Sequence, residues 1–160
     1  MSSTNYAGFW LRFVAYIIDY IIVYVAQSFV LLPIFAALGF GFATTPGLFD
    51  DSMSTEEAVG MIAAFASVMS VTIFITFVIQ VLYFSLMESS KSQATVGKIA
   101  LGLKVTDANG NKLDFGKALL RNLGKIVSSM ILGIGYIMAG FTEKKQALHD
   151  MIASTLVVKK

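Results

Sequence analysis

Two uncharged runs of thirty residues each decide what this sequence can fold into. They cover residues 20–49 and 58–87. A helix needs roughly 20 apolar residues to cross a bilayer, whereas a soluble helix carries charges on its solvent-facing side. The runs therefore predict two transmembrane helices, at about residues 9–32 and 59–82.

The composition excludes the common classes of soluble protein. Apolar residues make up 56% of the chain and charged residues only 14%, whereas soluble domains carry about 25% charged residues. A disordered chain, a cytosolic enzyme and a nucleic-acid-binding domain are therefore excluded. Because the chain has no cysteine and only one histidine, we expect no metal site, no cofactor and no enzymatic activity.

The charges of the flanking segments predict the orientation of the chain. The loop between the two helices, residues 39–57, contains acids but no lysine or arginine, whereas residues 88–125 contain seven bases. Cytoplasmic segments of membrane proteins are enriched in lysine and arginine. We therefore expect the loop outside, and the basic region and both termini in the cytoplasm.

The basic region is expected to meet the membrane surface. Its bases are spaced apart with few aromatic residues between them, which favours anionic lipid headgroups over nucleic acid as partner. The candidates for headgroup contact are Lys98, Lys104, Arg121 and Lys125.

A third apolar segment occupies residues 126–142 and has bases on both sides. Gly133 and Gly135 lie at its centre and allow the backbone to turn. One alternative is a re-entrant or interfacial hairpin, which keeps the tail, residues 143–160, in the cytoplasm. The other is a third span, which would carry the tail outside. We favour the re-entrant form, because the bases at both ends indicate the cytoplasmic side.

A short hairpin is predicted within the basic region. The Asn109-Gly110 pair separates residues 103–107 from residues 112–113, and Asn-Gly is the strongest short signal for a hairpin turn. Residues 155–159 have strand character too. The expected fold is an all-α membrane protein of one domain, residues 1–160, with a small cytoplasmic β-hairpin that pairs with the C-terminal strand or stands alone.

Two charges lie inside the first predicted helix. Arg12 is about 5 Å and Asp19 about 15 Å from the helix start at Phe9, which brings Asp19 near the middle of the bilayer. Polar side chains share one face with them, and a second row lies on the other helix. Both rows together contain Tyr16, Gln27, Thr72, Thr76, Gln80 and Tyr83. We expect the two rows to face each other.

Intramembrane carboxylates are costly and commonly mark ion or proton paths. Asp19 is therefore a candidate for coupling ions to protons. The alternative is that Asp19 only holds helices together through hydrogen bonds. Arg12 is either a partner of this carboxylate or an anchor at the lipid headgroups.

Several motifs together resemble one family of bacterial membrane proteins, the RDD family. The resemblance covers nearly the whole chain and is weakest in the loop. The motifs are Gly8-Phe9-Trp10-Leu11-Arg12-Phe13 with Asp19, Thr95-Val96-Gly97-Lys98, Leu101-Gly102-Leu103-Lys104-Val105, Leu119-Leu120-Arg121-Asn122, Gly133-Ile134-Gly135-Tyr136 and Gln146-Ala147-Leu148-His149-Asp150.

The arginine and the two aspartates that name the family map to Arg12, Asp19 and Asp150. The resemblance makes Asp150, beside His149, a candidate partner of Arg12 at the cytoplasmic end of the first helix. Arg12 and Asp150 thereby join Asp19 as candidates for ion or proton coupling. The resemblance also implies the bacterial inner membrane. The chain departs from the family at Ile99 and Met151, where a base is common.

Two functions follow as expectations. The first is a small cation/proton transporter that acts as a homo-oligomer, because two spans and a re-entrant segment cannot enclose a path alone. Some members of the family are reported as sodium(potassium)/proton antiporters, which agrees with a monovalent cation and a proton as ligands. The second is a membrane adaptor or assembly factor in which Arg12, Asp19 and Asp150 are structural.

Overall fold

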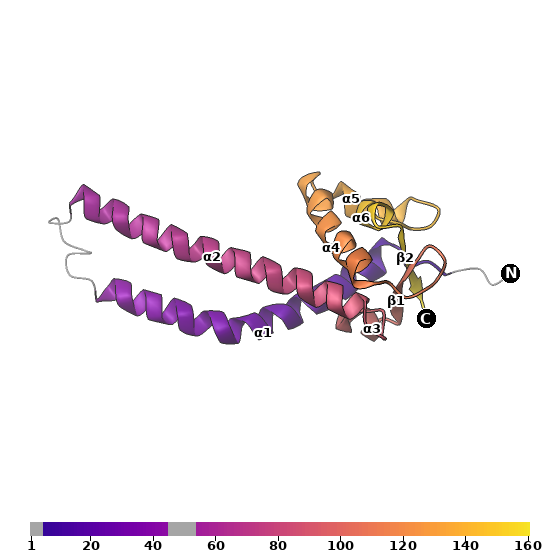
Figure 1. Cartoon of the computed structure of the whole chain (residues 1–160), viewed down its shortest axis with the longest axis horizontal. Helices are drawn as coiled ribbons and strands as arrows, with labels where there is room; N and C mark the ends of the chain where they lie inside the picture. Colours follow the sequence, from indigo (N-terminus) through magenta and orange to yellow (C-terminus); the bar gives the residue numbers. More distant parts are fainter. Residues whose placement is uncertain (1–4, 45–53) are drawn as a thin grey trace. The chain divides into compact units, whose positions relative to one another are not determined.

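The computed structural model describes residues 5–44 and 54–160. Its elements and their order along the chain are shown in Figure 1. They are α1 (Phe9–Ala43), α2 (Thr55–Glu88), α3 (Val96–Ala100), β1 (Leu103–Asp107), α4 (Phe115–Met130), α5 (Ile134–Ile137), η1 (Met138–Gly140), α6 (Leu148–Ile152) and β2 (Thr155–Lys159). The chain divides into two compact units: the first contains the described chain up to Ile22 and from Ile79 onward, and the second contains Val23–Val78.

Helices α1 and α2 are both long and apolar enough to cross a membrane, as the uncharged runs predict. Both are longer than expected. The first helix is expected to end at about residue 32, directly before Pro33, but α1 continues through this proline to Ala43. A proline removes one backbone hydrogen bond, whereas a helix that ended within the bilayer would leave several backbone groups unsatisfied. Most of the predicted loop, residues 45–53, lies outside the described residues.

The third apolar segment is a bent helix pair. Helix α4 and the short helices α5 and η1 meet at an angle of 118°, which is the geometry of a broken span or of a re-entrant loop. The break lies at Leu132 and Gly133, whose φ angles are 53° and 76°. A glycine adopts this left-handed conformation without strain, so Gly133 allows the chain to turn where the sequence predicts.

A two-stranded antiparallel sheet lies in the first unit, with Val105 opposite Val157. The predicted Asn-Gly turn is present, since Gly110 has a φ of 84° and the Asp107 N–H donates to the Asn111 carbonyl. The partner of β1 is the C-terminal strand β2, while residues 112–113 form no strand. The Ala7 N–H donates to the Val157 carbonyl at 2.8 Å, so the chain before α1 is tied to the free edge of β2.

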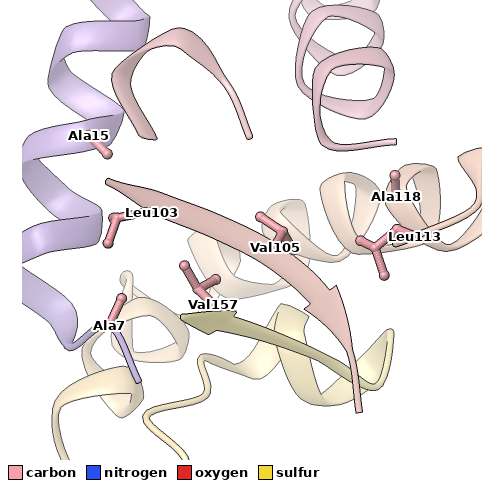
Figure 2. Close-up of a cluster of buried hydrophobic side chains, with 7 residues drawn as sticks. All are labelled: Ala7, Ala15, Leu103, Val105, Leu113, Ala118 and Val157. Carbon is pink, nitrogen blue, oxygen red and sulfur yellow. The ribbon is translucent and has the colours of Figure 1, made fainter. Parts of the chain in front are cut away.

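Small and branched apolar side chains fill the core of the first unit. Figure 2 shows Val105 and Val157 from the two strands, together with side chains from neighbouring elements. The complete cluster is Ala7, Ala15, Leu103, Val105, Leu113, Ala118 and Val157. Three of these residues are alanines, which allow the helix backbones to come close to the sheet. The core therefore joins the start of α1 and the start of α4 to the sheet.

Candidate functional site: a buried charged cluster

Six charged side chains lie buried in the first unit, and we call them the charged cluster. They come from five helices, and none is more than 11% exposed. Taking an ion out of water costs several kcal/mol unless it is paired, and here three acids balance three bases. The members are Arg12 and Asp19 of α1, Glu88 of α2, Lys98 of α3, Arg121 of α4 and Asp150 of α6.

Asp150 joins three elements through its two carboxylate oxygens. Its Oδ2 accepts a hydrogen bond from Arg12 Nη1 and another from the Ala147 N–H at 3.0 Å, at the start of α6. Its Oδ1 accepts from Arg121 Nε at 2.8 Å. The expected contact between Arg12 and Asp150 is therefore present. Arg121, which lies in one of the motifs but was expected at lipid headgroups, adds a second cation.

The guanidinium group of Arg12 is held inside the protein. Its Nε donates to the Ala7 carbonyl at 2.8 Å, and its Nη2 donates to the Lys145 carbonyl at 2.6 Å. With Nη1 on Asp150, all three nitrogens have a protein acceptor. Arg12 is thus a partner of Asp150 and of the C-terminal region, and among the described residues it forms no ion pair with Asp19.

Glu88 is the centre of the other half of the charged cluster. Arg121 Nη1 donates to both of its carboxylate oxygens, at 2.6 and 2.7 Å. Lys98 Nζ donates to Oε1 as well, and Asn122 Nδ2 lies 3.2 Å from Oε2. Because Arg121 binds Glu88 and Asp150 at once, it links the end of α2 to α6.

Asp19 has three hydrogen-bond donors and no exposed surface. The Gly97 N–H donates to Oδ1 at 2.7 Å and the Tyr83 hydroxyl to the same oxygen at 3.0 Å. The Thr95 hydroxyl donates to Oδ2. Asp19 therefore ties α1 to the end of α2 and to the start of α3.

Gly97 lies directly against the backbone of α1. A Cβ at this position would lie 2.1 Å from the Ala15 carbonyl oxygen and 3.0 Å from the Asp19 carboxylate carbon. Because a Cβ atom essentially never lies within 3.0 Å of a nonbonded atom, only glycine fits here without a shift of the backbone. The Thr95-Val96-Gly97-Lys98 motif thus combines a hydroxyl and an N–H for Asp19, a close approach to α1, and a cation for Glu88.

Burial and neighbouring charges determine the protonation states of Asp150 and His149 in α6. Burial alone would raise the pKa of Asp150, but the charges of Arg121 and Arg12 outweigh burial and hold that pKa below its usual range. Burial lowers the pKa of His149 to about 2, although Asp150 opposes this effect. His149 is therefore neutral, and its Nδ1 lies 3.2 Å from the Ser128 hydroxyl.

A cavity of about 340 Å³ borders the charged cluster within the first unit. Arg12, Asp19, Lys98 and Arg121 line it on one side, together with Lys125 of α4. Aromatic and aliphatic side chains from α1, α2 and the bent helix pair line the rest. The cavity has the size of a small-molecule site, for which about 300 Å³ is the lower end of the usual range.

The two predicted rows of polar side chains meet at two described points. In the first unit Tyr83 binds Asp19, and in the second unit Gln27 Nε2 donates to the Thr76 carbonyl at 3.4 Å. Other members of the rows lie differently. The Thr72 hydroxyl donates to Val68 of its own helix, Gln80 is only half-buried, and Tyr16 lines the cavity.

The structure also separates the four candidates for headgroup contact. Lys98 and Arg121 are 6% and 2% exposed and are both paired with Glu88. Their charges are used inside the protein, so neither is available to a lipid headgroup at the surface. Lys104 is half-buried on β1. Lys125 has no carboxylate partner among the described residues, and its Nζ lies 4.0 Å from the centre of the Phe84 ring.

Sequence reasoning missed Glu88, which is as central as the three residues expected from the motifs. A signal was present, because Glu88 is the first charge after the second uncharged run. An acid at that place needs a basic partner if the helix end is buried. Among the described residues, no group of three histidine, aspartate or glutamate side chains is arranged to hold a metal ion.

Comparison with known proteins gives one family. The model of the RDD family matches residues 6–154. Over 155 residues the chain is 41% identical to the uncharacterized protein YxaI of Bacillus subtilis (strain 168), covering 96% of this chain and 97% of that protein. It is 32% identical to the uncharacterized membrane protein YteJ of the same organism, over 96% of this chain and 80% of that protein. No solved structure matches the chain.

Proposed function

Because the chain belongs to the RDD family of membrane proteins, we propose that it is a membrane adaptor or assembly factor whose family residues have a structural role. In this proposal Arg12, Asp19 and Asp150 fix the helices and the sheet of the first unit to the start of α1. The observation that carries the proposal is the environment of Asp19, which is fully buried and holds three donors. A carboxylate that binds ions in turnover needs a free oxygen and a path for the ion.

The position of Asp19 along α1 also supports a structural role. Residues 20–43 of α1 lie beyond it and measure about 36 Å along the helix axis. The hydrocarbon core of a bilayer is about 30 Å thick, so this part of α1 is long enough to cross it without Asp19. The carboxylate then belongs at the boundary of the membrane, where its donors Thr95 and Gly97 come from the basic region.

The surface that would bind a partner is basic. Seven lysines of the first unit are exposed, and none of their ammonium groups forms an ion pair with a member of the charged cluster. They are Lys91, Lys112, Lys117, Lys144, Lys145, Lys159 and Lys160. Under the positive-inside rule this surface faces the cytoplasm of a bacterium, next to the inner membrane. Acidic protein surfaces and anionic headgroups are the chemical classes that it suits.

The substitution Asp19→Asn tests this proposal. The asparagine keeps the shape but removes the charge, and one of its positions becomes a donor. We expect a loss of about 3 kcal/mol in the free energy of unfolding, because hydrogen bonds to a charged group are replaced by weaker ones. Denaturant titration in detergent measures this loss. Glu143→Gln, an exposed position with the same change of charge, is the control and should leave stability unchanged.

A cation/proton transporter that acts as an oligomer is the second candidate function. One observation favours it, which is that Asp19 is among the residues that line the cavity. Sodium or potassium flux driven by a pH gradient in proteoliposomes separates the two candidates. Flux by the unmodified chain that disappears in a stable Asp19→Asn variant supports transport and rejects the adaptor proposal.

A further inference from the structure

The bend between α4 and α5 shapes one side of the cavity. Because the chain turns at Leu132 and Gly133, Tyr136 lies back against α4, where its hydroxyl donates to the Lys125 carbonyl at 3.1 Å. The Ser129 hydroxyl donates to the same carbonyl at 2.8 Å. The Tyr136 hydroxyl, which also lies 3.3 Å from the Ser129 hydroxyl, therefore holds the turn against α4, so the cavity is a built feature of the first unit.

The bases that line the cavity differ in one respect. Arg12, Arg121 and Lys98 each have a carboxylate partner, in Asp150 or Glu88. Among the described residues Lys125 has none, and its ammonium group stands over the Phe84 ring at 4.0 Å. The charged cluster holds three acids and three bases, so Lys125 is the base lining the cavity that has no matching carboxylate among the described residues.

The remaining wall of the cavity is apolar and reaches the surface. Leu132 is 91% exposed, and Ile137 and Phe13 are about half exposed. Large apolar side chains in this position are unfavourable in water but favourable against lipid chains. An occupant that satisfies both walls carries one anionic group and a hydrocarbon chain.

We propose that this cavity binds one anionic membrane lipid, with the lipid phosphate on Lys125 and an acyl chain along Leu132 and Ile137. A free phosphate ion has the same anionic group and could pair with Lys125, but it would leave the apolar wall of the cavity without a contact. The site is independent of the adaptor proposal, because it needs neither a protein partner nor the exposed lysines.

The first measurement uses the unmodified full-length chain in a neutral detergent. Phosphatidylglycerol and phosphatidylcholine with the same acyl chains are added, and bound lipid is counted by native mass spectrometry. In a second measurement the lysines are acylated with and without bound lipid, and the acylated positions are identified by peptide mass spectrometry. We expect about a tenfold preference for phosphatidylglycerol, the factor for one charge-assisted contact. We also expect phosphatidylglycerol to protect Lys125 but not Lys117, an exposed lysine of the same helix.

Variants locate the contact. Lys125→Gln should bring the preference for phosphatidylglycerol to about one, Lys125→Arg should keep it, and Lys117→Gln should leave it unchanged. Equal binding of both lipids to the unmodified chain overturns the proposal, as does equal protection of Lys125 and Lys117. Inorganic phosphate is tested in the same way. If it protects Lys125 at the same concentration as phosphatidylglycerol, the lipid proposal is rejected, and the ligand is a soluble anion. If Lys125→Gln does not fold, the protection of Lys125 in the unmodified chain still decides.

Discussion

The substitution Gly97→Ala is expected to destabilise the protein strongly, although alanine is the better helix former. Without tertiary contacts the change would stabilise a helical position by about 0.5–1 kcal/mol. Here the new Cβ would lie 2.1 Å from the Ala15 carbonyl oxygen, while ordinary contact begins at 3.4 Å. The Ala15 oxygen belongs to the backbone and not to the flexible end of a side chain. Helix α3 must therefore move away from α1 by about 1 Å.

The magnitude follows from what this movement breaks. Overpacking of a tight contact costs about 1–3 kcal/mol. The same shift stretches the 2.7 Å hydrogen bond from Gly97 to Asp19 beyond useful range, and a hydrogen bond to a charged group contributes about 1.5–3 kcal/mol. After subtraction of the helical gain, these terms give a loss of about 1.5–5.5 kcal/mol. The middle of this range corresponds to about 10 °C in the unfolding temperature.

Circular dichroism during thermal and denaturant unfolding in detergent measures this loss. Gly60→Ala is the matched control, since Gly60 is a helical glycine of α2 and a Cβ added there would meet nothing within 4 Å. We expect that variant to be as stable as the unmodified chain or slightly more so. If Gly97→Ala behaves like Gly60→Ala, the close approach of α3 to α1 is wrong, and so is the role of Asp19 as their link.

Two further predictions concern the charged cluster and its neighbour His149. Glu88→Gln should cost about 3–5 kcal/mol, because it leaves Arg121 and Lys98 buried with too little negative charge; Glu56→Gln, at an exposed position, should change stability little, and equal losses would contradict the pairing. Stability should rise with pH between about 5 and 7.5, by about 2 kcal/mol, because the unfolded chain binds a proton at His149 below pH 6.5 whereas the folded chain, with the pKa lowered to about 2, does not. The lowered pKa of Asp150 acts in the same direction below pH 3.8, its usual value. Denaturant titrations at several pH values measure the slope, and a histidine NMR signal that titrates near pH 6.5 in the folded protein would contradict it.

The membrane-spanning segments could be predicted from the sequence because a spanning helix depends only on its own residues. A run of apolar residues crosses a bilayer whatever its neighbours are, and its backbone satisfies its own hydrogen bonds. The turn at Gly133 and the Asn109-Gly110 turn were readable for the same reason, since each depends on a few adjacent residues. Helix ends were less so, because Pro33 has a different effect within a bilayer than in water.

Strand pairing was only partly predicted from the sequence. The expected pairing of residues 103–107 with the C-terminal strand is present as β1 and β2, but residues 112–113, the expected second strand of the hairpin, form no strand. The alternation of apolar residues in a strand shows that it has a partner, and several segments can supply one. The added bond from Ala7 to Val157 had no signal in the sequence at all.

The charged cluster shows the same division more sharply. The motifs pointed to Arg12, Asp19 and Asp150, but they could not show that Glu88 binds Lys98 and Arg121. Those two bases appeared in the sequence as spaced cations suited to lipid headgroups. Whether a base faces lipid or a buried acid depends on how five helices pack together. Apart from Lys98 and Glu88, which are 10 positions apart, the ion pairs of the charged cluster join residues 29 to 138 positions apart. Local chemistry therefore determined which segments enter the membrane. Only packing over long sequence distances decided which buried charges pair with each other, and that Lys125, among the bases lining the cavity, has no carboxylate partner within the described residues.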